Sequence, residues 1–124
     1  MNSKFLGLRT VIYHVPDIKK AKDWYTKALG IKPYFDEDFY VGYNVGGYEL
    51  GLHPEEKSSK PKDAGPTTYW GVENVQRVFD ELLAAGATVH ENPNNVGGEI
   101  VVASVKDPWG NVFGIIYNPE FEAD

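Results

Sequence analysis

Apolar and polar residues alternate along the chain in a pattern that predicts the same order of strands and helices twice. In the first copy, residues 8–14 are apolar and β-branched, as in a strand. Asp17 is a suitable helix N-cap, Gly30 suits the end of that helix, and apolar residues recur between them at helical spacing. Three more strands are expected, at residues 31–35, 39–45 and 48–53. The first copy therefore predicts a βαβββ unit.

The second copy repeats this order of elements. A strand at residues 67–73 leads into a helix that starts after Asn74 and ends at Gly86. The expected later elements are strands at residues 87–91, 99–105 and 112–117, with a loop at residues 92–98. We predict an α+β fold in one domain, residues 1–124, with module one at about residues 5–54, a linker at 55–66 and module two at about residues 67–119.

The two faces of each predicted sheet differ in character, because side chains alternate along a strand. Large apolar residues share one parity and are expected to pack under the helices, among them Leu50, Leu52, Trp70, Phe113 and Ile115. The opposite parity is smaller and more polar, and it includes Thr10, Ile12, His14, Glu49, Gly51, His53, Thr67, Tyr69 and Gly114. This second set suits the wall of a ligand cleft, and the alternative is that it is the less tightly packed side of a sheet.

Composition narrows the classes of function. The chain has 18 acidic and 12 basic residues, a net charge of −6, and no basic stripe, so nucleic acid is not an expected partner. The acidic surplus favours a cationic or neutral ligand over a phosphate. The absence of cysteine excludes disulfides, thiol nucleophiles and cysteine-bound zinc. No segment is apolar enough for a membrane span or a signal peptide, so we expect a cytoplasmic protein and no membrane partner.

Three motifs together resemble a known superfamily. They are Val15-Pro16-Asp17, the run Asp-Trp-Tyr-Thr-Lys-Ala-Leu-Gly-Ile at residues 23–31, and Asp107-Pro108-Trp109-Gly110-Asn111 before an apolar strand. With these motifs the chain is similar to the vicinal oxygen chelate superfamily, which includes glyoxalase I, extradiol dioxygenases and bleomycin-binding resistance proteins. The resemblance implies two βαβββ modules forming a cupped, open mixed-sheet barrel around a cleft, with helices on the outer face. It also implies a homodimer.

The resemblance further indicates where the enzymes of this superfamily hold their metal ion. Their ligands are histidine, glutamate or glutamine in the first and last strand of each module, and the matching positions here are Thr10, Gly51, Thr67 and Gly114. Glycine has no ligand side chain, and a neutral hydroxyl binds transition metals poorly. We therefore expect no metal and no cofactor. The expected function is a metal-independent small-molecule binding protein that resembles the bleomycin-type resistance and sequestration proteins.

A second hypothesis gives the chain an enzymatic role. His14, Glu49 and His53 are residue types that bind divalent metals or transfer protons, so a glyoxalase-like lyase, isomerase or dioxygenase is the alternative function. The competing interpretation is that these three are half-exposed residues near strand ends, and it is the one we favour. His90 is likewise expected to be solvated.

Aromatic residues supply the remaining candidates for ligand binding. Tyr69 has the parity of the cleft, Tyr40 or Tyr43 is a further candidate, and Trp109 lies on a tight turn at the expected rim. Aromatic walls with a hydroxyl or an indole N–H bind flat organic molecules by stacking and a few hydrogen bonds. The predicted partner is therefore a small organic ligand, aromatic or cationic.

Overall fold

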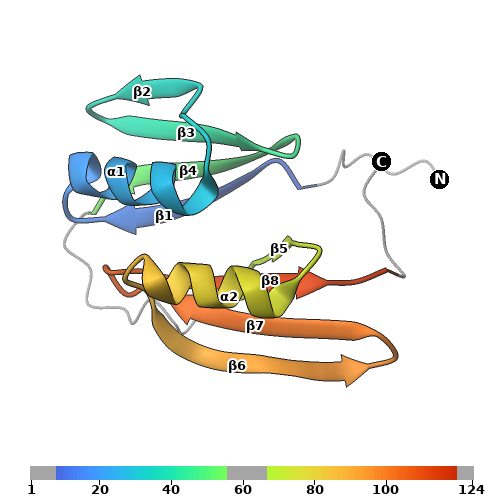
Figure 1. Ribbon diagram of the computed structural model, residues 1–124. Coiled ribbons are helices and arrows are strands. Elements are labelled where there is room, and N and C mark those ends of the chain that lie inside the picture. The colour runs from blue at the N-terminus through green and yellow to red at the C-terminus, as the bar shows by residue number, and fades with distance from the viewer. Residues whose placement is uncertain (1–7, 56–66, 120–124) are drawn as a thin grey trace, which may run out of the picture. The chain divides into compact units, whose positions relative to one another are not determined.

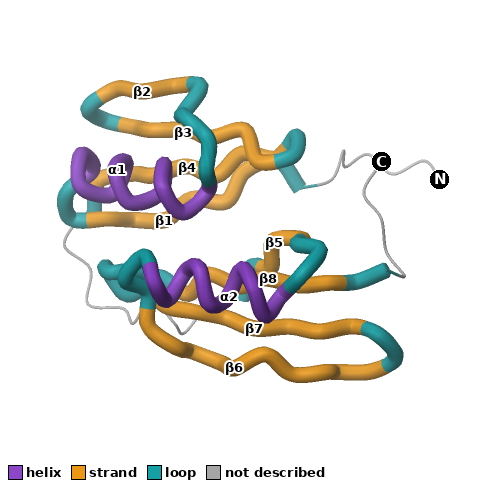
Figure 2. Tube along the Cα trace, in the orientation of Figure 1, coloured by secondary structure: helices purple, strands orange, loops and turns teal. Residues whose placement is uncertain are grey.

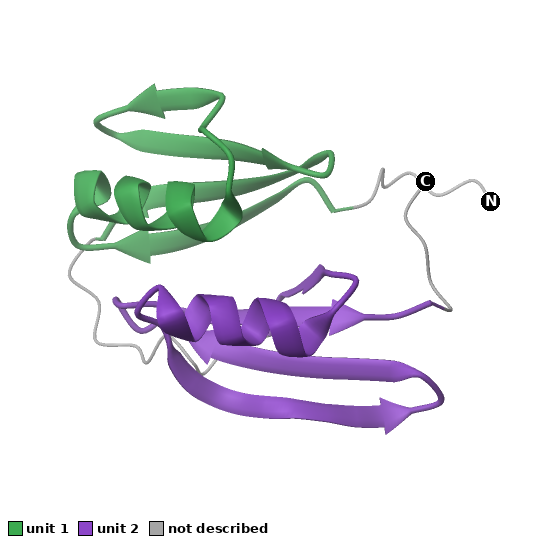
Figure 3. Cartoon of the chain, viewed as in Figure 1, with its two compact units in different colours: residues 1–57 green, residues 58–124 purple. Residues whose placement is uncertain are grey.

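The computed structural model describes residues 8–55 and 67–119, which fall in two compact units, residues 1–57 and 58–124 (Figure 3). The elements are β1 (Thr10–Val15), α1 (Ile18–Leu29), β2 (Phe35–Glu37), β3 (Tyr40–Val45), β4 (Tyr48–Pro54), β5 (Tyr69–Gly71), α2 (Val75–Ala84), β6 (Thr88–Gly97), β7 (Ile100–Lys106) and β8 (Val112–Tyr117) (Figure 1). Each unit has the order βαβββ, so the predicted α+β class with two βαβββ modules is confirmed. The predicted linker lies, apart from Glu55, outside the described residues.

Unit 1 is a four-stranded mixed sheet in the order β1-β4-β3-β2, with α1 packed against β3 and β4 (Figure 2). Strand β1 runs parallel to β4, and the other neighbours are antiparallel. The buried core under the helix contains apolar and aromatic side chains, namely Tyr13, Val15, Ala21, Tyr25, Val41, Tyr43, Leu50 and Leu52. The opposite parity of β1 is exposed, because Thr10, Ile12 and His14 point away from this core.

Helix α1 begins and ends where the sequence predicts. The carboxylate of Asp17 accepts hydrogen bonds from the backbone N–H groups of Lys19 and Lys20, at 3.1 and 3.2 Å. Such an N-cap typically stabilises a helix by about 1 kcal/mol. Gly30 ends the helix with φ of 73°, a left-handed conformation that side chains disfavour, and its N–H donates to Thr26 O.

A tight hairpin between β3 and β4 fixes which residues face each other in unit 1. Gly46 and Gly47 both have positive φ, 61° and 95°, as a two-residue type I′ turn requires. The side chain of Asn44 supports the turn by accepting a hydrogen bond from Gly47 N at 2.9 Å. The resulting register places Gly42 opposite Gly51 and Asn44 opposite Glu49.

Unit 2 is a second four-stranded mixed sheet, in the order β5-β8-β7-β6, with α2 packed against β6, β7 and β8. Its core contains Trp70, Val75, Phe79, Leu82, Val105, Phe113 and Ile115. The rings of Trp70 and Phe113 stack with centroids 6.4 Å apart. Helix α2 is capped by Asn74, whose side chain accepts from Arg77 N at 3.0 Å, and the chain leaves it through Gly86 with φ of 109°.

Three strands differ most from their predicted bounds in the structure. Strand β2 was expected at residues 31–35 but begins at Phe35, because Pro33 has no N–H to donate and pairing with β3 starts at Tyr34 N, which donates to Gly42 O at 2.9 Å. Strand β5 is shorter than predicted, since only Tyr69–Gly71 pairs with β8.

The third difference concerns β6. Residues 92–98 were expected to form a loop, but β6 pairs with β7 as far as Gly97. Register shifts along this ladder absorb the irregular residues, including Pro93, which a regular ladder excludes. Neither sheet closes into a barrel. The cupped arrangement of modules around a cleft stays a prediction. None of the helices in the described residues is both long and apolar enough to span a membrane.

Candidate functional site: a carboxylate on a glycine floor

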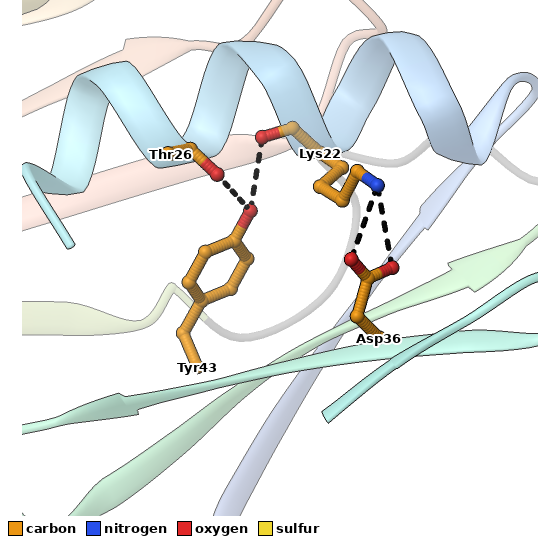
Figure 4. A network of polar contacts seen from close by, with 4 residues as sticks. All are labelled: Lys22, Thr26, Asp36 and Tyr43. Atoms are coloured by element: carbon orange, nitrogen blue, oxygen red, sulfur yellow. Dashed lines mark hydrogen bonds and ion pairs between the residues drawn. The ribbon is translucent and has the colours of Figure 1, made fainter. Parts of the chain in front are cut away.

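The two faces of the sheet in unit 1 are identified by Tyr43. Its hydroxyl lies 2.9 Å from Thr26 Oγ1 and donates to Lys22 O at 3.0 Å, so Tyr43 points at α1 (Figure 4). Burial and the hydrogen bond to the neutral hydroxyl of Thr26 act in opposite directions on its pKa, and burial dominates, so the pKa is raised. Tyr40 has the opposite parity and lies on the other face. Of the two tyrosines considered from the sequence, only Tyr40 therefore shares a face with the predicted ligand-binding residues of unit 1.

On this second face, Gly42 of β3 and Gly51 of β4 lie opposite each other, and neither has a side chain. A Cβ atom on Gly51 would lie 2.0 Å from the hydroxyl oxygen of Tyr40, and one on Gly42 would lie 2.7 Å from Glu49 Oε2. Neither distance is compatible with a side chain, because carbon and oxygen atoms in contact are more than 3 Å apart. The glycine pair thus leaves the space in which the Tyr40 phenol and the Glu49 carboxylate lie.

The carboxylate of Glu49 collects hydrogen bonds from three hydroxyl groups. Thr10 Oγ1 donates to Oε1 at 2.9 Å, because the parallel register of β1 and β4 places Thr10 beside Glu49. Tyr40 donates to the same oxygen at 2.8 Å. Tyr34, which precedes β2, donates to Oε2. Three segments of unit 1 therefore converge on one negative charge.

These hydrogen bonds set the protonation states at the site. Partial burial by itself raises the pKa of Glu49, but the hydrogen bonds from Tyr34, Tyr40 and Thr10 outweigh it and lower the pKa below the ordinary value of 4.5. The pKa of Tyr40 is raised by burial and by its hydrogen bond to the carboxylate, and that of Tyr34 is raised mainly by the hydrogen bond. At neutral pH the site therefore holds one ionised carboxylate and two neutral phenols.

Exposed aromatic and apolar side chains lie near the residues that donate to this carboxylate. The ring of Phe35 lies 6.1 Å from that of Tyr40 and 6.0 Å from that of Phe39, measured between centroids. Tyr34 and Phe39 are 64% and 63% exposed, and Ile12 on β1 is 46% exposed. Large exposed apolar side chains next to an oriented charge are a common feature of ligand-binding surfaces.

The two histidines predicted on this face lie together but apart from Glu49. His14 and His53 are register partners whose rings pack edge to face with centroids 5.4 Å apart. His53 Nδ1 lies 2.8 Å from Pro54 O. His53 is four residues beyond Glu49 on β4, roughly 13 Å along the strand. Within residues 8–55 and 67–119, no group of three or more His, Cys, Asp or Glu side chains could hold a metal ion, so the postulated trio does not form there.

In unit 2, Gly114 is also covered by a tyrosine. A Cβ on Gly114 would lie 2.5 Å from Thr68 O and 2.6 Å from Tyr69 Cδ1. Tyr69 is the register partner of Gly114 and is 40% exposed, while Thr67 is exposed just before β5. A role for Thr67, Tyr69 and Gly114 in ligand binding stays a prediction.

His90 differs from its prediction. Its Nδ1 atom lies 2.8 Å from Ser104 Oγ, and Ser104 is buried on β7. The side chain is half-buried rather than solvated, because the register shift between Val89 and Glu91 turns His90 toward a hydroxyl that needs a partner.

Trp109 lies on the turn between β7 and β8, where it is half-buried. The backbone N–H of Trp109 donates to Asp107 Oδ1 at 2.9 Å, and the same oxygen accepts from the backbone N–H of Asn111 at 2.8 Å. The buried Asp107 side chain thus holds the turn. The contacts of this motif explain its place in the fold, and a ligand-binding role for Trp109 stays a prediction.

A hollow in unit 1 lies on the helix side, beside the ion pair of Lys22 Nζ and Asp36 Oδ2 at 3.1 Å (Figure 4). It has a volume of about 570 Å³ and is lined by Lys22, Asp23, Thr26, Lys27, Lys32, Pro33 and Asp36. Three lysines and two aspartates line it, so it presents no single oriented charge comparable to Glu49.

Sequence reasoning missed Tyr34 and Gly42. Gly42 had a readable signal, because a two-residue Gly46-Gly47 turn places residue 42 opposite residue 51. Two glycines that face each other on paired strands indicate a space that another side chain fills. Tyr34 carried no such signal, since it comes from a segment that was assigned to the middle of a strand.

Comparison with known families identifies the fold. The sequence profile of the Glyoxalase/Bleomycin resistance protein/Dioxygenase superfamily matches residues 7–115. The chain belongs to this superfamily. No curated protein matches the sequence.

Solved structures with the same fold cover nearly the whole chain. A glyoxalase-related enzyme from Fulvimarina pelagi has a TM-score of 0.79 and 17% identity, and the match covers 97% of this chain and 94% of that one. A glyoxalase/bleomycin resistance protein/dioxygenase family enzyme from Burkholderia phytofirmans PsJN has a TM-score of 0.72 and 20% identity, with coverage of 87% and 95%. TioX from Micromonospora sp. ML1 has a TM-score of 0.67 and 18% identity, with coverage of 90% and 98%. At these identities the likeness shows the fold alone.

Within unit 1, the residues at the superfamily's metal-ligand positions do not fit a metal ion. Thr10 directs its hydroxyl proton to Glu49, and Gly51 offers only backbone. The phenol of Tyr40 lies where the Cβ of a ligand residue at position 51 would have to be. Tyr40 therefore takes up space that a metal-binding side chain needs.

Proposed function

We propose that unit 1 binds a small organic cation, without a metal ion, at Glu49 and the aromatic side chains around it. The observation that carries this proposal is the carboxylate of Glu49, which three neutral hydroxyl groups hold in its ionised form. A charge that is already oriented loses little conformational freedom when it meets its partner, and this favours binding.

The aromatic rings supply the second part of the recognition. Tyr34 donates a hydrogen bond to the carboxylate, and the ring of Phe35 lies next to those of Tyr40 and Phe39. Tyr34, Phe35 and Phe39 are all partly exposed. A cation over an aromatic face gains about 0.5–2 kcal/mol, and a charge-assisted hydrogen bond about 1.5–3 kcal/mol. An organic cation with an apolar body satisfies both, and the net charge of −6 favours its approach.

Protonation equilibria favour binding over acid–base catalysis at this site. A general base works best with a pKa near the working pH, but the pKa of Glu49 is lowered away from neutrality. Tyr34 and Tyr40 are shifted in the opposite direction and are poor acids. We therefore rank sequestration above the glyoxalase-like alternative. The homodimer implied by the family resemblance and the cytoplasmic location expected from the sequence remain proposals.

Calorimetry with matched probes tests the proposal. The full chain is titrated with 2-phenylethylamine, which is cationic at neutral pH, and with 2-phenylethanol, which has the same ring but no charge. We expect the amine to bind at least about tenfold more tightly, and Glu49→Gln to remove the difference. Prior dialysis against a chelator should leave the affinity unchanged. Equal binding of both probes, or an affinity that needs added metal, would overturn the proposal.

A further inference from the structure

The three hydrogen bonds to the Glu49 side chain are divided unevenly between its two carboxylate oxygens. A carboxylate has about four acceptor positions, two on each oxygen. Oε1 receives both Thr10 and Tyr40, whereas Oε2 receives only Tyr34 among the described residues. One position, on Oε2, is left for a ligand.

The hydroxyls on Oε1 come from anchored side chains. Thr10 is held beside Glu49 by the pairing of β1 with β4, and the half-buried Tyr40 lies over Gly51 with no Cβ beneath it. Tyr34 is more exposed, but its backbone N–H is fixed to Gly42 O at 2.9 Å. Oε2 lies directly over the backbone of Gly42 on its sheet side, so a ligand reaches that oxygen from the solvent side.

We infer that the site selects a cation with one N–H directed at the carboxylate, an ammonium group, and discriminates against the guanidinium and amidinium groups. A planar guanidinium gains its strength by donating to both oxygens of a carboxylate in parallel. That geometry needs a free position on Oε1, and Thr10 and Tyr40 occupy both. This inference rests on the proposed function, because it specifies the class of cation that the same site takes.

Two probes with the same apolar body test the selectivity. The full chain is titrated calorimetrically with 2-phenylethylammonium and with 2-phenylethylguanidinium at neutral pH. We expect the ammonium compound to bind about tenfold more tightly, although guanidinium groups normally pair better with carboxylates. Equal or tighter binding of the guanidinium compound overturns the inference and leaves the proposed function standing. Binding of neither compound overturns both.

A substitution then tests the stated cause of the selectivity. Thr10→Val removes one donor to Oε1 and keeps a β-branched residue of the same shape in β1. We expect the guanidinium compound to gain about tenfold in affinity while the ammonium compound changes less than about threefold, which narrows or reverses the preference. The matched control is Thr88→Val, an exposed position at the start of β6, which should change neither affinity. Tyr40→Phe removes the other donor to Oε1 and should shift the preference in the same direction. An unchanged preference in both Thr10→Val and Tyr40→Phe overturns the inference.

Discussion

Units 1 and 2 share one topology, and each covers a glycine of its last strand with a tyrosine, but the tyrosines come from different places. In unit 1 the covering residue is Tyr40 on β3, whose hydroxyl reaches across the sheet to lie over Gly51. In unit 2 it is Tyr69 on β5, the direct register partner of Gly114. The space left by the missing glycine side chain is thus filled by the phenol hydroxyl of Tyr40 in unit 1 and by the ring edge of Tyr69 in unit 2.

The surroundings of the two glycines differ more than the glycines do. Two residues before Gly51 is Glu49, whereas two residues before Gly114 is Val112. Opposite Gly51 is Gly42, whereas opposite Gly114 is Ser104, which is hydrogen-bonded to His90. At the matching position of its last strand, unit 2 therefore has no counterpart of the Glu49 carboxylate. A duplicated fold can thus keep a covered glycine in the last strand of both copies while placing a carboxylate beside it in only one.

The largest expected effect on stability comes from adding a methyl group at Gly114 in unit 2. In Gly114→Ala the new Cβ meets Thr68 O at 2.5 Å, and a backbone atom held in a β-ladder has little room to move. We expect a loss of about 3 kcal/mol in the free energy of unfolding, measured by urea denaturation. Gly71→Ala is the control, because a Cβ there meets nothing within 4 Å, and it should be nearly neutral. Equal stability of the two variants would contradict the tight packing at Gly114.

The matching substitution in unit 1 should affect binding more than stability. In Gly51→Ala the new Cβ meets the hydroxyl oxygen and two ring carbons of Tyr40, at 2.0, 2.6 and 2.9 Å. All three atoms belong to a side chain and none to the backbone, so Tyr40 is displaced from Glu49 while the sheet is kept. We expect a loss of about 1–2 kcal/mol in stability, with at least about a tenfold loss in affinity for 2-phenylethylammonium. Calorimetry and urea denaturation on the same preparation separate the two effects. Unchanged affinity would show that the position of Tyr40 does not matter to the ligand.

Removing one hydroxyl from each covering tyrosine sharpens the comparison further. Tyr40→Phe deletes a hydrogen bond to a charged, part-buried group and should cost about 1–2 kcal/mol in stability. Tyr69→Phe removes a partly exposed hydroxyl with no hydrogen bond in the described part of the chain, and it should cost less than about 0.5 kcal/mol. Urea denaturation of both variants measures the difference. Equal costs would mean that the Glu49 network contributes nothing to folding.

The smallest effect is the pH dependence that the Glu49 hydrogen bonds give to unit 1. The pKa of Glu49 in the folded protein lies below 4.5, so the stabilisation is present above that pH and is lost as the pH falls through the folded pKa. Tyr34 and Tyr40 have pKa values raised above 10.0, so their stabilisation is present below that pH and is lost as the pH rises. The difference in unfolding free energy between the wild type and Glu49→Gln should be flat between these limits and shrink beyond both. A slope near neutral pH would contradict these assignments.

Much of the fold could be predicted from the sequence, because single residues determine where the helices begin and end. Asp17, Gly30 and Asn74 mark helix ends through their own hydrogen bonds and φ preferences, and the structure confirms them. Strand ends depend on partners elsewhere in the chain, which explains the shifted start of β2 and the extension of β6 to Gly97.

The candidate site was only partly predictable for the same reason. Thr10, Glu49 and Gly51 have a parity that can be read from the sequence, so their shared face was expected. The contact of Tyr34 with Glu49 depends on how the segment before β2 turns, and no spacing rule reports that geometry. The separation of His14 and His53 from Glu49 follows from strand rise once the register is known.

The pairing of Thr10 with Glu49 also has a consequence for how the protein assembles. These residues are separated by 39 positions and meet only when the last strand of unit 1 docks in parallel beside the first. Contacts that close such long loops form late and slowly in folding. A molecule captured by Glu49 would therefore recognise chains whose unit 1 has completed its most distant pairing, and it would slow their return to the unfolded ensemble.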